Sequence, residues 1–99
     1  MPKVSREGDE LSTGHACVAT TVLDTPGQST VFANSILIAR ITDPTVPHPA
    51  PPIPPCPKHV KFVNVGSSTV SVVGLPIARI GDSTDEGQMT KGSDTVFAG

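Results

Sequence analysis

STVFANSILIARITD, residues 29–43, returns without a gap as STVSVVGLPIARIGD at residues 68–82. A third copy is divided between the two ends of the chain. Its first half is the C-terminal DTVFAG, residues 94–99, and its second half is the N-terminal KVSREGD, residues 3–9. Self-similarity at a fixed spacing is the signature of repeated structural units. A unit shared by both termini predicts that the termini lie side by side, in a ring of three units around a pseudo-threefold axis.

Each repeat has the pattern of a β-hairpin. In the first copy, β-rich runs at 30–32 and 36–38 flank a polar turn at Asn34 and Ser35. In the second copy Gly74 takes the turn position, and no apolar pattern at helical spacing persists for three turns. The sequence therefore predicts a single all-β domain over residues 1–99. Its expected shape is a small cone, with three hairpins at the base and three long loops converging on a tip.

Composition excludes several functional classes. The net charge is −2 and the basic residues do not cluster, which argues against nucleic-acid binding. No apolar run approaches the roughly 20 residues that span a bilayer, and no signal peptide follows Met1, so we expect synthesis in the cytoplasm. The chain has three Phe and no Tyr or Trp. A small core so poor in large side chains predicts an additional staple such as a metal.

The loop between residues 43 and 61 holds eight of the eleven prolines. Proline fixes φ and removes a backbone donor, so this segment is expected to be extended and stiff, close to polyproline II. The alternative interpretation of this composition is a disordered linker. A position inside a repeat, together with two His and one Cys, favours the stiff loop, which would form a point above the base.

All three histidines of the chain fall into one candidate metal site. His15 lies six residues after Asp9 and His48 five residues after Asp43, while Gln88 takes the matching place in the third unit. The long loop adds a Cys-x-x-His step, in which one tight turn can aim two ligands at one ion. The predicted ligands of one structural Zn²⁺ are His15, His48, Cys56 and His59. The alternative is that the histidines are incidental.

The cysteines leave other possibilities open. Cys17 and Cys56 could form a disulfide, but a chain without a visible secretion signal favours reduced thiols. Cys17 could instead replace Cys56 as the sulfur ligand, although His-x-Cys is a poorer chelating step. Four protein ligands leave no open position on the metal, and no nucleophile motif is present, so we expect no enzyme. The recurring acids are expected to form turns: Asp9, Asp43 and Asp82.

The motif Pro-Ile-Ala-Arg-Ile-Gly-Asp at 76–82, with degenerate copies at 38–40 and 4–6, resembles the proline-alanine-alanine-arginine motif of PAAR-repeat proteins. The first Ala of that motif is Ile77 here. The resemblance implies a cone that caps the trimeric spike of a contractile phage tail or a type VI secretion system. It also implies one zinc near the tip, held by three His and one Cys. The expected destination is a virion tail baseplate or a secretion-system spike, delivered to the target-cell envelope.

The predicted partner is a trimeric β-helical spike that binds one copy per trimer, with transient contact with the target membrane and no nucleic acid or small-molecule substrate. A pseudo-threefold monomer can match a threefold partner and cover its exposed strand edges. The predicted docking residues are Val31, Phe32, Asn34, Ser35, Val70, Val72, Gly74, Val96 and Phe97. The alternative function is a zinc-stabilised adaptor that docks cargo onto a spike, and a metal-dependent hydrolase is a weaker one. No toxin domain accompanies the repeats, so we expect a plain tip of the phage type.

Overall fold

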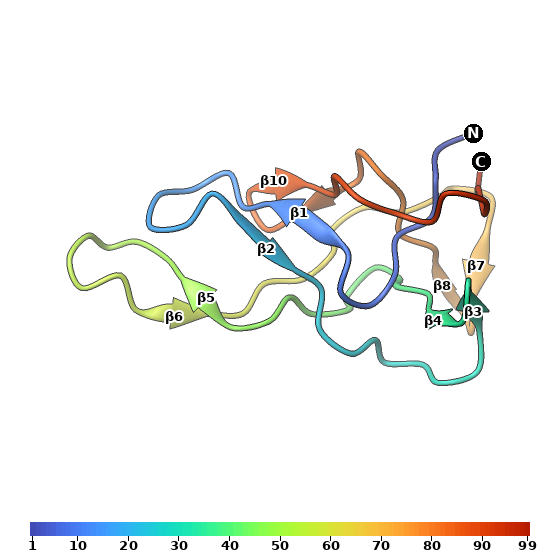
Figure 1. The fold of residues 1–99 in the computed structure, drawn as a ribbon, viewed down its shortest axis with the longest axis horizontal. Coiled ribbons are helices and arrows are strands. Elements are labelled where there is room, and N and C mark those ends of the chain that lie inside the picture. The colour runs from blue at the N-terminus through green and yellow to red at the C-terminus, as the bar shows by residue number, and fades with distance from the viewer.

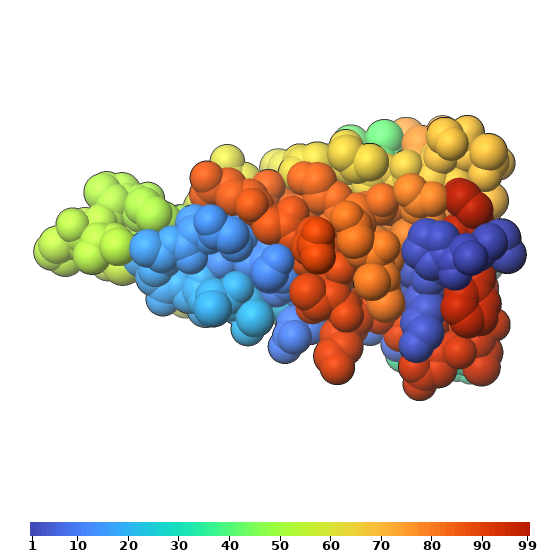
Figure 2. Space-filling model, turned by 90° about the horizontal axis from the view of Figure 1, so that it is seen from above, coloured from blue at the N-terminus to red at the C-terminus, as the bar shows by residue number.

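The protein tapers from a broad end to a narrow one. The computed structural model describes residues 1–99 and measures 40 × 24 × 21 Å along its principal axes. Both termini lie at the broad end, and the narrow end is formed by residues near the middle of the chain (Figure 1, Figure 2). All regular elements are short strands, so no helix is available to cross a membrane. The predicted all-β cone is confirmed.

Two repeats form tight antiparallel hairpins at the broad end, as predicted. They are β3 (Phe32–Ala33) with β4 (Ile36–Leu37), and β7 (Ser71–Val72) with β8 (Leu75–Pro76). The turn residues have positive φ: 55° and 66° at Asn34 and Ser35, and 48° and 84° at Val73 and Gly74. Two consecutive positive φ values match the right-handed twist of the strands. The pairing is shorter than the predicted runs, because the next residue of each hairpin bridges to a neighbouring repeat.

The two ends of the chain come together as the repeat pattern predicts. Lys3 forms an antiparallel bridge with Phe97, and the amide of Ala98 donates to the carbonyl of Pro2 at 3.0 Å. This pairing corresponds to that of Phe32 with Leu37 in the first hairpin. The N-terminal and C-terminal segments therefore complete one hairpin-like unit between them.

A closed ring of backbone hydrogen bonds joins the three units. The amide of Ala39 donates to the carbonyl of Ser5, that of Ser5 to Ala78, and that of Ala78 back to Ala39, at 2.9 to 3.0 Å. All three residues are fully buried. A small side chain at this position of the motif lets three backbones approach one another, which explains why the repeat places Ala or Ser before its Arg.

The Arg-x-x-Asp step folds into the same turn in every unit. The Asp carboxylate accepts a hydrogen bond from the Arg backbone amide at 2.7 to 2.9 Å, and the Arg side chain lies 3.0 to 3.5 Å from the same carboxylate. The Asp amide donates to the Arg carbonyl. The three pairs are Arg6–Asp9, Arg40–Asp43 and Arg79–Asp82. These acids act in turns.

The buried apolar residues form two clusters. The cluster at the broad end consists of Val4, Ala33, Ile38, Val72, Ile77 and Ala98. The second cluster consists of Leu11, Leu23, Ala39, Val63, Ala78 and Met89. Neither contains an aromatic ring, because Phe32, Phe62 and Phe97 are all exposed. The largest side chains of the chain therefore lie on its surface.

Each of the three long loops folds back as a short hairpin. They are β1 (Glu10–Ser12) with β2 (Thr20–Val22), β5 (His48–Pro49) with β6 (Lys58–His59), and β9 (Ser83–Thr84) with β10 (Gly87–Gln88). The prediction of one extended segment for the proline-rich loop is therefore wrong. Its few remaining amides pair across the loop: Ala50 donates to Pro57 and Cys56 donates to Pro52, each at 2.9 Å. The reversal between β5 and β6 forms the narrow end (Figure 1).

Candidate metal centre near the narrow end

Three histidines from two loops converge on one point. His48 and His59 are cross-strand partners on β5 and β6, and His15 lies in the turn between β1 and β2. The Nε2 atom of His59 lies 2.8 Å from Nε2 of His48 and 3.1 Å from Nε2 of His15. The structure thus brings together the three histidines that the sequence analysis selected.

The fourth ligand atom comes from Asp85, in the turn between β9 and β10. Its Oδ2 lies 2.6 Å from His48 Nε2, 3.0 Å from His15 Nε2 and 3.4 Å from His59 Nε2. The Asp85 side chain is fully buried, and the four ligand atoms lie within 4.8 Å of one another. All three loops therefore contribute to one centre.

Asp85 is a candidate ligand that was not predicted from the sequence. Gln88 was identified as the third-unit equivalent of His15 by counting from the repeated Asp, but Gln88 is exposed. The third loop is the shortest, so its turn comes sooner after Asp82. A requirement that each loop supply one ligand would have pointed to the acid at this turn.

The remaining imidazole nitrogens fix the orientation of two rings. Nδ1 of His15 lies 2.8 Å from the carbonyl oxygen of Ala16, and Nδ1 of His48 lies 2.9 Å from that of Val46. A carbonyl oxygen only accepts, so each Nδ1 donates its hydrogen. In the neutral tautomer, Nε2 then presents a lone pair to the centre. This arrangement is typical of metal-ligating histidines, whose second nitrogen is held by a carbonyl or carboxylate.

The pKa values of Asp85 and His15 are both shifted toward the charged form of each side chain. Burial raises the pKa of Asp85, but hydrogen bonds from His48 and His15 outweigh it and leave the pKa below its usual value. Burial lowers the pKa of His15, yet the bond to the Ala16 carbonyl and the Asp85 carboxylate together leave it raised. Oδ1 of Asp85 is buried without a hydrogen-bond partner. A buried carboxylate facing three converging nitrogens attracts either a proton or a metal ion.

The four residues fit a small divalent cation. Three imidazole nitrogens and one carboxylate oxygen form a ligand set that Zn²⁺ accepts. Bonds of about 2.0–2.1 Å in a tetrahedron place neighbouring ligand atoms about 3.3 Å apart. Five of the separations in this cluster run from 2.6 to 3.4 Å. The four ligand atoms all lie within 4.8 Å of one another, so the residues are close enough to hold one metal ion after their side chains adjust.

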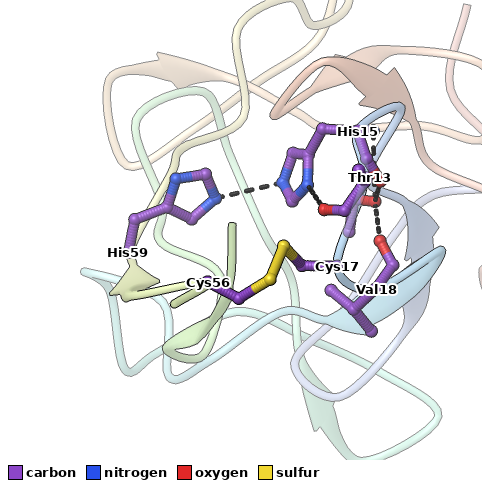
Figure 3. The surroundings of a disulfide bond; sticks show 7 residues. Thr13, His15, Cys17, Val18, Cys56 and His59 are labelled. Atoms are coloured by element: carbon purple, nitrogen blue, oxygen red, sulfur yellow. Dashed lines mark hydrogen bonds between the residues drawn. A yellow bond between two sulfur atoms is a disulfide. The ribbon is translucent and has the colours of Figure 1, made fainter. Parts of the chain in front are cut away.

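Cys56, the predicted sulfur ligand, is instead joined to Cys17 in a disulfide (Figure 3). The expectation of reduced thiols, and of either cysteine as a ligand, is wrong for this structure. Cys17 follows His15 by two residues and Cys56 precedes His59 by three, so the convergence of the histidines also brings the cysteines together. Their Cα atoms are 6.0 Å apart, within the usual range for a disulfide. The carboxylate of Asp85 occupies the place that was assigned to sulfur.

The predicted docking residues differ in accessibility. Five are exposed: Phe32, Asn34, Ser35, Gly74 and Phe97. Three are partly buried against the broad-end cluster: Val31, Val70 and Val96. Val72, which was predicted to contact the partner, is only 8% exposed and belongs to that cluster. Its side chain is therefore not available to a partner. Alternation along β7 explains this, because Ser71 faces outward and Val72 inward. Docking by the exposed residues stays a prediction.

A family model described as PAAR motif matches residues 12–89. The chain belongs to the PAAR-motif family. No curated protein sequence shows significant similarity to it. Membership of the PAAR-motif family indicates a role at the tip of a spike in a contractile injection system. It also implies association with a spike protein, in a phage tail or a secretion system.

Proposed function

We propose that this PAAR-motif protein caps a trimeric β-helical spike, one copy per trimer, and forms the metal-stabilised point of that spike. The observation that carries the proposal is the ring of hydrogen bonds among Ser5, Ala39 and Ala78. Because the same bonds recur in each unit, one monomer offers three similar edges. A threefold partner can then be covered by a single copy.

The broad end has the surface chemistry of a docking face. Phe32 is 53% exposed and Phe97 is 45% exposed, and the two occupy matching places in their repeats. Val73 and Met1 add exposures of 59% and 85%. Large apolar side chains gathered on one face commonly mark an interaction site. A spike end would cover them.

The narrow end is suited to brief contact with a lipid membrane. Residues 49–57 carry no charge, and six of these nine residues are proline. Of the three remaining amides, those of Ala50 and Cys56 already donate within the loop. The apex therefore has few backbone donors to strip of water, a step that is expensive in hydrocarbon. Ile53, at 61% exposure, is the large apolar side chain of this apex.

The metal in this proposal is one structural Zn²⁺. Four protein ligands leave no open position for a substrate or an activated water, so the centre stabilises rather than catalyses. It would hold the turn with His15, the β5–β6 pair and the turn with Asp85 against one another. We assign no enzymatic activity to the chain.

A pair of acidic substitutions tests the docking face. Ser35→Asp places a charge on the exposed turn of the first hairpin, where the positive φ of 66° is one that Asp tolerates. Ile53→Asp places the same charge at the apex as a matched control. Light scattering of each variant mixed with the purified trimeric spike should show weakened capping for Ser35→Asp alone. Equal binding by both variants, with both folded, would reject the broad end as the docking face.

A further inference from the structure

We propose that Val73 is a docking residue, which supplies for the second repeat the apolar contact that Phe32 and Phe97 supply for the other two. This role rests on the proposed function, because the partner is the end of the trimeric spike. A threefold end presents the same surface three times, so each repeat of the cap faces an equivalent site. The repeat pattern alone does not identify Val73, because the position of the two phenylalanines is Ser71 in the second repeat.

The second repeat is the exception in a set of matching exposed side chains. Phe32 and Phe97 occupy equivalent positions and are both exposed. Ser71 takes this position in β7, so no large side chain projects from it. The exposed apolar side chain of the second repeat comes two residues later, at Val73 in the β7–β8 turn. Every repeat therefore places an exposed apolar side chain at the broad end, but the second repeat does so from a different position.

Val73 is an unfavourable residue for the backbone position that it occupies. Its φ is 48°, in the left-handed region, where a β-branched residue is a genuine outlier. Hairpin turns with positive φ at both central residues favour Asn, Asp or Gly. The first repeat follows that preference, with Asn34 at the matching place. Because backbone strain of this kind is concentrated at functional sites, a contact with a partner explains this valine better than the needs of the turn do.

Asn34 and Val73 also differ in what their side chains do inside the molecule. The Asn34 carboxamide joins the first repeat to the third, since Nδ2 donates to Thr95 Oγ1 at 2.8 Å and Oδ1 accepts from Arg6 at 3.3 Å. At the second turn the backbone makes the corresponding joint, because the buried Arg40 donates to the carbonyl oxygen of Val73 at 3.0 Å. The Val73 side chain belongs to neither apolar cluster, nor to the residues packed against them. It is therefore free to face a partner.

The surface around Val73 has the composition of an interface core. Residues 29–37, 68–76 and 95–99, which lie at the broad end, contain no Asp, Glu, Lys or Arg (Figure 1). These residue types make up 16% of the whole chain, so their absence here is a local feature. Depletion of charge and enrichment of aromatic residues are characteristic of the buried centre of protein–protein interfaces. The partner that fits this face is an apolar, uncharged spike end.

The substitution Val73→Asn separates docking from folding. Asparagine suits this backbone position and lacks the apolar contact. We therefore expect the urea midpoint of Val73→Asn to equal or exceed that of the wild-type chain. Binding to the purified trimeric spike, measured by titration calorimetry, should weaken about ten-fold or more, since full burial of a valine side chain contributes roughly this factor.

Thr42→Asn is the matched control. Thr42 is also β-branched and exposed, with a φ of 71°, but its amide donates to Val63 of the second cluster. Its replacement should leave spike binding unchanged. Wild-type affinity in Val73→Asn would overturn the docking role of Val73 and leave the cap intact. A lower urea midpoint for Val73→Asn would also overturn it, because the valine would then serve the fold. Failure of the wild-type chain to bind the spike would reject the proposed function, and this role with it.

Discussion

Removal of the disulfide gives a quantitative test of how the narrow end is held. The double variant Cys17→Ser with Cys56→Ser opens a covalent loop whose ends are 39 residues apart. In the chain-entropy account, a cross-link of this span lowers the entropy of the unfolded chain by about 13 cal/mol/K, or about 4 kcal/mol at 25 °C. That is a large part of the total stability expected for a domain of this size.

Urea denaturation in the presence of a chelator isolates this contribution from that of the metal. The chain has no Trp or Tyr, so circular dichroism is the suitable signal. With an m-value of about 1.5 kcal/mol/M, a loss of about 4 kcal/mol lowers the midpoint by about 2.7 M. Ser68→Ala, at an exposed position, is a matched control and should change stability by no more than about 0.5 kcal/mol. A change below about 1 kcal/mol in the double variant would refute the assignment of the disulfide as a staple of the tip.

Three further predictions concern the centre itself. Zinc affinity should fall as the pH falls, because the imidazole ligands must be unprotonated and the pKa of His15 is raised in the metal-free protein. A zinc affinity that does not change with falling pH would contradict the ligand set. In the metal-free protein a lower pH has the opposite effect, because protonated His15 stabilises the fold. Its contribution to folding stability is complete below its ordinary pKa and declines as the pH rises through the raised pKa. Unfolding measured as a function of pH would reveal this decline. Gly87→Ala should destabilise the fold by about 2 kcal/mol or more and weaken zinc binding, since a Cβ there would lie 2.1 Å from the carbonyl oxygen of Ser12, close to the turn that carries Asp85. Calorimetry on Gly87→Ala beside Gly99→Ala, where the added Cβ has no neighbour closer than 3.5 Å, separates this clash from the general effect of losing a glycine.

Much of the fold could be predicted from the sequence because the same contacts are encoded three times. A hairpin, a small buried residue and an Arg-x-x-Asp turn recur at fixed spacing, and each recurrence specifies the same local hydrogen bonds. The split copy at the termini also specified that the ends meet. The loops were harder to predict, because proline composition describes local stiffness and not the point at which a chain reverses. The β5–β6 hairpin depends on pairing of Ala50 with Pro57, which no periodic pattern records.

Only part of the candidate site could be predicted from the sequence, for a different reason. Histidine is rare in this chain, so its three copies stood out, whereas Asp85 resembles any acid in a turn. Its role depends on the length of the third loop and on burial, which are properties of the assembled fold. The Cys17–Cys56 disulfide was considered but reduced thiols were favoured, because a missing secretion signal was given too much weight as evidence about redox state. The inward direction of the Val72 side chain depends on where the hairpin turn lies, because side chains alternate between the two faces of a strand. A turn shifted by one residue would have directed Val72 outward.

The number of copies bound to each spike tests the central claim most directly. Native mass spectrometry of the chain mixed with its purified trimeric spike reports this number, since each bound copy adds 10.2 kDa. The pseudo-threefold cap predicts a single added copy per three spike chains, even when the small protein is in excess. Three added copies per trimer would contradict the cap and favour an adaptor that binds each spike chain separately.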